Sequence, residues 1–329
     1  MTTPILICDD SSFARKQIAR ALPASLTENI SFAKNGEEAL NIIRQGGADL
    51  MFLDLNMPSM DGYEVLAEIR KHDLQTMVIV VSGDVQPEAH RRVMAMGALA
   101  FIKKPVQQAE LIQVLSNFGI QGENSQAPAN VAVTTDSWDC YRELANVAMG
   151  QAADLLARLL NVFIKMPVPK VKLIRPNELN RTFKHIDNNE QVSAVCQGFI
   201  GAGISGEALL IFSQSSFHDI AELMNYEGDL NDMIELELLM DIGSVMISAF
   251  LKGFANQMDI NFSQGSPVVL SKQSNIANTF SQADPKWKNT LAIEMRCAIE
   301  HRQIRCNLLL LFSEDSLKAL HNIVSVLAG

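Results

Sequence analysis

The chain has 329 residues, of which 48% are hydrophobic and 19% charged, enough apolar material for two domains that each bury a core. The net charge of −10 repels phosphate backbones, so nucleic acid is not expected as a partner. The N-terminal apolar run is too short for a signal peptide, and no stretch approaches the roughly 18 apolar residues of a membrane span. We therefore expect a cytoplasmic protein with no membrane partner.

Up to about residue 118, short apolar runs alternate with stretches of helical periodicity. The runs are Ile5–Cys8, Ile30–Ala33, Leu50–Leu53, Met77–Val81 and Leu99–Ile102. Strands that alternate with helices predict an α/β fold with a doubly wound parallel sheet of five strands. We assign residues 1–120 to this first domain.

Residues 121–136 are polar, small and without apolar periodicity, which predicts a linker. A segment of this length spans at most roughly 55 Å, and about 20–25 Å is typical of a flexible coil.

Residues 137–329 contain an internal repeat. The segment Leu209–Phe217 matches Leu309–Leu317 at an offset of 100 residues, and in both an apolar strand runs into a serine-rich helix start. Helices expected at about 138–164 and 233–256 open the two halves. Strands are expected at 168–174, 192–200, 204–212, 260–271, 289–299 and 303–312. The duplication predicts an α+β domain with pseudo-two-fold symmetry and one shared sheet.

The five cysteines are scattered and form no CxxC pair. We interpret all of them as reduced core thiols, and expect neither a disulfide framework nor a zinc site. They are Cys8, Cys140, Cys196, Cys297 and Cys306.

Reactive side chains follow four of the expected strands of the first domain. Asp9 and Asp10 follow the first strand, Asp54 the third, Ser82 ends the fourth and Lys104 follows the fifth. Ligands of open parallel sheets bind beyond the carboxyl ends of the strands, so these groups should converge. Clustered carboxylates suit Mg²⁺, and a carboxylate nucleophile gives an aspartyl phosphate. A hydroxyl and an ammonium group can then hold two phosphoryl oxygens.

Each of these groups also has a plainer interpretation when it is considered singly. An isolated acid pair before a helix usually caps that helix, a lone Lys-Pro usually lies in a loop, and Ser-Gly forms a turn. The combination at the ends of four strands favours phosphoryl transfer, with Asp54 as the residue that is phosphorylated.

The sequence around Asp54, DLNMPSMDGYEVL, resembles the phosphorylation loop of two-component response regulators, especially the CheY-like receivers of chemotaxis. The resemblance covers residues 4–118. It implies Mg²⁺ bound by Asp9, Asp10, Asp54 and the backbone carbonyl of Asn56, and phosphorylation by a sensor histidine kinase. It also implies a cis bond between Lys104 and Pro105.

The same resemblance assigns an aromatic switch to Phe101, where many of these domains have Tyr, so the switch has no hydroxyl here. Asn56 and Asp84 occupy the two positions that tune self-dephosphorylation in the family.

A polar pair lies in the helix that opens the second domain. Glu143 and Asn146 are three residues apart and share a helix face, and Gly150 is the next residue along it. Gly within a helix costs about 1 kcal/mol relative to Ala, but it lets another backbone approach closely. The alternative is a solvated face of an amphipathic helix with a kink at the glycine.

A weakened copy of this pattern lies in the second half, where Asp241, Ser244 and Ser248 align with Glu143, Asn146 and Gly150. The duplicated arrangement resembles the CheC/CheX/FliY family of chemotaxis phosphatases over roughly residues 137–328. In that family the Glu binds the conserved Lys of a phosphorylated CheY-like receiver and the Asn positions the attacking water. The resemblance implies that Glu143 and Asn146 are catalytic, while Asp241 and Ser244 form a degenerate second site.

Two functions stay open at this point. In the first, the chain is a response regulator whose second domain dephosphorylates a CheY-like receiver, either a separate protein or its own Asp54. In the second, that domain is a non-catalytic adaptor that binds a signalling or flagellar partner under control of phosphorylation. Members of both families often form homodimers.

Overall fold

The computed structural model describes residues 3–120, 137–175, 178, 192–213, 217–224, 226–270, 289–300, 302 and 304–328. The chain divides into two compact units, unit 1 (Met1–Gly150) and unit 2 (Gln151–Gly329). The predicted linker at residues 121–136 lies outside the described residues. Among the described residues, no helix is long and apolar enough to cross a membrane.

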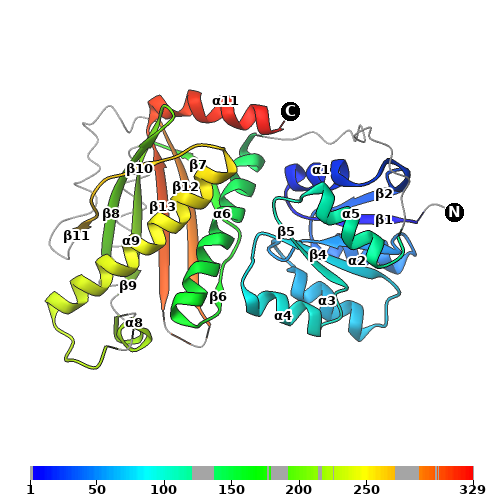
Figure 1. The fold of residues 1–329 in the computed structure, drawn as a ribbon, viewed down its shortest axis with the longest axis horizontal. Helices are drawn as coiled ribbons and strands as arrows, with labels where there is room; N and C mark the ends of the chain where they lie inside the picture. The colour runs from blue at the N-terminus through cyan, green and yellow to red at the C-terminus, as the bar shows by residue number, and fades with distance from the viewer. Residues whose placement is uncertain are drawn as a thin grey trace. The chain divides into compact units, whose positions relative to one another are not determined.

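Unit 1 is built around a five-stranded parallel sheet with the strand order β2-β1-β3-β4-β5 (Figure 1). The strands are β1 (Ile5–Cys8), β2 (Ile30–Ala33), β3 (Leu50–Leu53), β4 (Met77–Ser82) and β5 (Ala100–Lys103). Every residue of β1 and β3 is buried, as expected for strands that helices cover on both sides. The doubly wound α/β fold predicted for this region is confirmed.

Five helices cover the two faces of this sheet. They are α1 (Ser12–Ala21), α2 (Gly36–Arg44), α3 (Gly62–Lys71), α4 (Pro87–Ala95) and α5 (Gln108–Asn117). Apolar side chains of α1 and α5 share one core with the sheet, and those of α2, α3 and α4 share the other. Local signals fix where helices begin: Asn35 caps α2, and Asp61 and Glu64 form a capping box at α3.

Helix α6 (Ser137–Leu160) contributes residues 137–150 to unit 1 and residues 151–160 to unit 2. It ends four residues earlier than the sequence predicted. Asn161 has φ 52°, a left-handed conformation that Asn tolerates and that stops a helix. The residues that follow form a short strand, β6 (Ile164–Lys165), which the periodicity did not reveal because two residues carry no period.

Unit 2 contains an eight-stranded sheet with the order β10-β8-β9-β13-β12-β6, in which β11 also pairs with β8 and β7 with β12. The remaining strands are β7 (Lys170–Ile174), β8 (Val192–Gly201), β9 (Ile204–Ser213), β10 (Ser263–Gln264), β11 (Val268–Leu270), β12 (Thr290–Ile299) and β13 (Arg305–Phe312). The described residues of unit 2 also contain the helices α8 (Phe217–Leu223), α9 (Asp232–Gln257) and α11 (Leu317–Ala328), and α9 crosses one face of the sheet (Figure 1).

The two halves of this sheet are related by the predicted pseudo-two-fold symmetry. Among the described elements, each half opens with a long helix, continues through four strands and closes with a helix, from α6 to α8 and from α9 to α11. The central strands β9 and β13 are antiparallel, and Leu209 lies directly opposite Leu309, the residue to which the repeat aligns it. The symmetry axis therefore passes between these two leucines, and the shared α+β sheet is confirmed.

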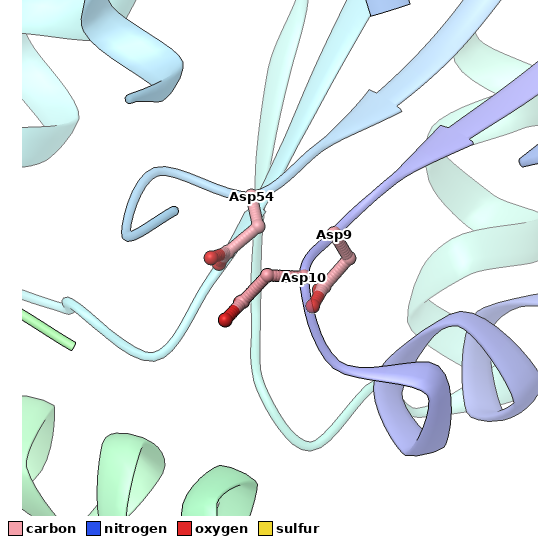
Figure 2. A group of neighbouring side chains, drawn as sticks. All are labelled: Asp9, Asp10 and Asp54. Atoms are coloured by element: carbon pink, nitrogen blue, oxygen red, sulfur yellow. The ribbon is translucent and has the colours of Figure 1, made fainter. Parts of the chain in front are cut away.

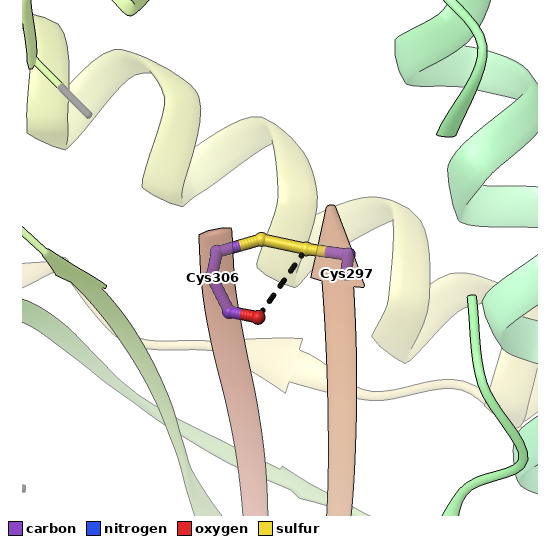
Figure 3. Close-up of a disulfide and its surroundings, with 2 residues drawn as sticks. All are labelled: Cys297 and Cys306. Carbon is purple, nitrogen blue, oxygen red and sulfur yellow. Dashed lines mark hydrogen bonds between the residues drawn. A yellow bond between two sulfur atoms is a disulfide. The ribbon is translucent and has the colours of Figure 1, made fainter. Parts of the chain in front are cut away.

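The cysteine prediction was wrong for one pair. Cys297 of β12 and Cys306 of β13 form a disulfide, while Cys8, Cys140 and Cys196 are free (Figure 3). The two strands form an antiparallel hairpin whose register puts Cys297 opposite Cys306, with a Cα–Cα distance of 5.3 Å. That distance suits a disulfide, but it depends on the strand register, which a spacing of nine residues alone does not reveal.

Candidate functional site

Three carboxylates meet at the carboxyl ends of β1 and β3. Asp9 and Asp10 directly follow β1, and Asp54 directly follows β3, so neighbouring parallel strands aim them at one another (Figure 2). Asp9 and Asp54 are buried, and one ligand oxygen from each of the three carboxylates lies within 4.8 Å of the others. The convergence predicted from the strand ends is present.

The electrostatics of this cluster fit a hard divalent cation. Burial, with the neighbouring carboxylates, holds the pKa of Asp9 well above its usual range and raises that of Asp10 to about 7. Buried carboxylates close to one another repel, which favours a cation between them, and oxygen ligands in such an arrangement suit Mg²⁺. Asp9, Asp10 and Asp54 can therefore hold Mg²⁺, and the backbone N–H of Asn56 donates to Asp54 Oδ2 at 3.0 Å.

Lys104 supplies positive charge to the same cluster from the end of β5. Its Nζ lies 2.8 Å from Asp9 Oδ2 and 3.1 Å from Asp54 Oδ1. Burial alone would lower the pKa of Lys104, but Asp54 and Asp9 hold that pKa well above its usual range, so the ammonium group stays charged. The cis Lys104–Pro105 bond implied by the receiver resemblance is confirmed.

The other residues of unit 1 that the sequence singled out are Ser82, Asp84 and Phe101. Ser82 is buried at the end of β4, and its hydroxyl accepts from the backbone N–H of Asp84 at 3.1 Å. Asp84 in turn accepts from the backbone and side-chain nitrogens of Gln86. Phe101 is half-buried on β5 and makes an edge-to-face contact with His90 of α4, with 5.5 Å between the ring centroids.

Glu143 of α6 reaches the cluster within unit 1. Its Oε1 lies 3.0 Å from Lys104 Nζ, so Lys104 contacts Asp9, Asp54 and Glu143 at once. Burial raises the pKa of Glu143 to about 7, against the opposing effect of Lys104. The pairing that sequence reasoning attributed to Glu143, a carboxylate on a receiver lysine, is present with the lysine of the same chain.

Asn146 lies one helical turn further along the same face of α6. Its side chain is buried, and Oδ1 accepts no hydrogen bond from any residue in the described part of unit 1. A buried amide oxygen without a donor is costly, because the group has lost water and gained no partner. An unpaired amide oxygen of this kind is suited to bind a water molecule or a substrate.

Gly150 allows the close backbone approach that the sequence predicted. A methyl group at this position would overlap the carbonyl oxygen of Gly83, in the loop that follows β4. A methyl group on Gly83 would lie 3.1 Å from the Cα of Val147 on α6, so both backbones come together where neither residue has a side chain.

Sequence reasoning missed Asp139, in the first turn of α6. Its Oδ2 accepts from the hydroxyl of Ser12 at 2.5 Å and from the backbone N–H of Phe13 at 2.9 Å. Asp139 lies four residues before Glu143 and so shares its face, which was a usable signal. Its partners, however, lie more than 120 residues away in the sequence.

The second copy of the motif is placed differently. On α9, Asp241 is exposed and Ser244 half-buried, whereas Glu143 and Asn146 are both buried. The degenerate character of the Asp241/Ser244 site stays a prediction.

The first unit is similar to known proteins. A family model described as the response regulator receiver domain matches residues 5–116. The chemotaxis protein CheY of Bacillus subtilis is 33% identical over 116 residues, which are 35% of this chain and 97% of that protein. The probable transcriptional regulatory protein NarL of Mycobacterium tuberculosis is 29% identical over 173 residues, 48% of this chain and 79% of NarL.

Among solved structures, Thermotoga maritima FliY aligns with 60% of this chain and 99% of its own, at 20% identity and a TM-score of 0.45.

Proposed function

Residues 5–116 of this chain belong to the response regulator receiver family, and we propose that α6 hydrolyses the aspartyl phosphate that forms on such a domain. The protein would thus act in phosphorylation-dependent two-component signalling as both phosphoacceptor and phosphatase. In this proposal a sensor histidine kinase phosphorylates Asp54, and the Asp54 phosphate, or that of a separate CheY-like receiver, is the substrate.

The observation that carries the proposal is the placement of Glu143 on Lys104, beside Asp54. Lys104 is the cation that would hold a phosphoryl oxygen, and Glu143 anchors α6 to it through a charge-assisted contact. Asn146, on the same helix face with a free amide oxygen, is then held near the phosphoryl group.

Each residue has a defined part in the hydrolysis. Asp54 carries the phosphoryl group, and Ser82 and Lys104 bind its oxygens. Asn146 orients a water molecule whose oxygen attacks phosphorus in line as the bond from phosphorus to the Asp54 oxygen breaks. Asp54 leaves as a carboxylate, the water oxygen becomes the fourth oxygen of the released phosphate, and the two protons of the water pass to phosphate oxygens or to solvent. Mg²⁺ held by Asp9, Asp10 and Asp54 would offset negative charge on the phosphoryl oxygens.

Asn146 is not a strong base, and the mechanism does not require one. Phosphoryl transfer passes through a loose transition state, so positioning and charge account for most of the catalysis. Misplacing a reacting group by about 1 Å can slow a reaction roughly 100-fold.

We expect Asn146→Ala to slow release of inorganic phosphate from the phosphorylated full chain about 100-fold, because the attacking water loses its orientation. The chain would be phosphorylated with acetyl phosphate and Mg²⁺, freed of the donor, and followed by phosphate release over time. Gln151→Ala, which removes an amide elsewhere on α6, is the matched control and should hydrolyse at the wild-type rate.

The adaptor function makes the opposite prediction in this assay. The same contacts of α6 would then only bind the receiver and take no part in hydrolysis, so Asn146→Ala and Glu143→Ala would not slow it. Wild-type phosphate release by the Glu143→Ala/Asn146→Ala double variant would sink the phosphatase proposal.

A further inference from the structure

Four residues of α6 line the single face of the helix that faces the receiver portion of unit 1. Asp139, Glu143, Asn146 and Gly150 follow one another at spacings of four, three and four residues, which keeps them on one side of a helix. Glu143 and Asn146 are accounted for by the proposed function. Asp139 has no part in that chemistry, although its side chain accepts hydrogen bonds from Ser12 and Phe13.

Asp139 holds the first turn of α1 from outside that helix. The backbone N–H of Phe13 lies in the first turn of α1, where backbone donors have no partner within the helix, and it donates to Asp139 Oδ2. The Ser12 hydroxyl donates to the same oxygen, and the Ser11 hydroxyl lies 3.5 Å away. Ser11 already caps α1 through Ala14, so Asp139 supplies a second, independent cap.

The charge of Asp139 is also matched locally. Arg142 Nη2 lies 3.5 Å from Asp139 Oδ1, and its Nη1 lies 3.9 Å from Asp10 Oδ2. Asp139 is only 6% exposed, so a receiver that did not offer these donors would leave a buried carboxylate short of partners.

The contacts that α6 makes differ in how well they can distinguish one receiver from another. Lys104 belongs to the phosphoryl-binding set, so its pairing with Glu143 suits any receiver that carries this lysine. The Ser12 hydroxyl and the bare backbone at Gly83 lie outside the phosphoryl-binding set, and they meet Asp139 and Gly150. Specificity arises where a wrong partner would leave a polar group unpaired or create an overlap.

We propose that Asp139 is a positioning and specificity residue that fits α6 to a receiver whose first helix begins with a hydroxyl residue, and that the substrate of α6 is the Asp54 phosphate of its own chain. This inference rests on the proposed phosphatase function and names its substrate. Asp139 fixes α6 along its axis, so that Glu143 meets Lys104 and Asn146 faces the phosphoryl group.

A double-mutant cycle on the full chain tests the positioning role. A hydrogen bond to a charged group contributes enough that Ser12→Ala and Asp139→Ala should each slow hydrolysis of the Asp54 phosphate about 10-fold. Because Asp139→Ala already removes the interaction that Ser12→Ala removes, the double variant should be no slower than Asp139→Ala alone. Ser12→Thr keeps the hydroxyl and should retain the wild-type rate, and Ser116→Ala at the exposed end of α5 is the matched serine control.

Two results would overturn the positioning role. One is a double variant whose loss is the product of the two single losses, and the other is a Ser12→Thr variant as slow as Ser12→Ala. If Asp139→Ala perturbs folding, as judged by circular dichroism, Asp139→Asn replaces it in the cycle.

Mixing two full-length chains tests whether the substrate is the chain's own phosphate. The first is the Asn146→Ala chain phosphorylated on Asp54, and the second is the Asp54→Ala chain, which keeps α6 but takes no phosphate. We expect excess Asp54→Ala chain to leave hydrolysis slow, and the wild-type rate constant to be independent of chain concentration. Restored hydrolysis in the mixture would overturn action on the own receiver.

These outcomes are separable from failure of the proposed function. If Asn146→Ala hydrolyses its own phosphate at the wild-type rate, α6 is not a phosphatase helix. If Asn146→Ala is slow but Ser12 and Asp139 are uncoupled, the phosphatase stands and only the specificity inference fails.

Discussion

At the residue scale, Lys104 contacts three buried carboxylates, Asp9, Asp54 and Glu143. A single ammonium group cannot neutralise three acids, and burial raises the pKa of Asp9 and of Glu143. The contact with Glu143 is therefore sensitive to whatever charge Asp54 carries. The proposed phosphorylation of Asp54 would change that charge, and would thereby link the chemistry at Asp54 to the contact between Glu143 and Lys104.

The cysteines give a prediction at the same scale. Burial raises the pKa of Cys140 to about 12 and that of Cys8 still further, and the thiolate is the reactive form. In the native protein at pH 8, the Cys140 thiol therefore stays protonated and unreactive. We expect a thiol-alkylating reagent to spare both residues and to label Cys196, which is half-buried.

Mass spectrometry after alkylation, with and without prior reduction, measures this. In the denatured, unreduced chain three thiols should label, because Cys297 and Cys306 are bonded to each other. Five labelled cysteines without a reductant would contradict the disulfide.

At the scale of the element, Gly150 lowers the intrinsic stability of α6 but allows the helix backbone to approach Gly83 closely. Gly150→Ala should favour the isolated helix by about 1 kcal/mol, because Ala has the higher helix propensity. The added methyl group would, however, overlap the carbonyl oxygen of Gly83. Propensity and packing therefore oppose each other at this position, and the overlap involves backbone that cannot rotate away.

We expect Gly150→Ala to slow hydrolysis of the Asp54 phosphate about 100-fold, because α6 must shift and misplace Asn146. Phosphate release measures the effect, and circular dichroism should show no loss of helix. Gly265→Ala is the matched control, since a methyl group there meets nothing closer than 3.6 Å. An unchanged rate in Gly150→Ala would show that the approach to Gly83 does not position Asn146.

The sequence predicted the elements better than the contacts between them. Apolar runs located β1 to β5 to within a residue, because alternation and helical periodicity are local properties. The spacing of Glu143, Asn146 and Gly150 identified the contact face of α6. The cap that Asp139 provides for Phe13 and the pairing of Cys297 with Cys306 depend on three-dimensional register, and no local pattern encodes them.

At the scale of the whole molecule, the symmetry of unit 2 centres on Leu209 and Leu309. Both are buried and directly opposed in the middle of the sheet, where β9 meets β13. Equivalent residues in equivalent surroundings should contribute equally to stability, although they lie 100 positions apart in the chain.

We expect Leu209→Ala and Leu309→Ala each to lower the free energy of unfolding by about 2–5 kcal/mol, the range for buried leucines. Because the two side chains are neighbours, the double variant should lose an amount different from the sum. Denaturant unfolding measures all three, with Val268→Ala at an exposed strand position as control. Clearly unequal single effects would contradict the symmetry.

The exchange of outer strands between the halves has a consequence for how unit 2 is made. Strands β6 and β7 of the first half pair with β12 of the second, while β10 and β11 of the second pair with β8 of the first. On the ribosome, residues 170–174 emerge long before residues 290–294, with which they pair. The nascent first half therefore waits with unpaired strand edges, a state prone to wrong association, until nearly the whole chain has been synthesised.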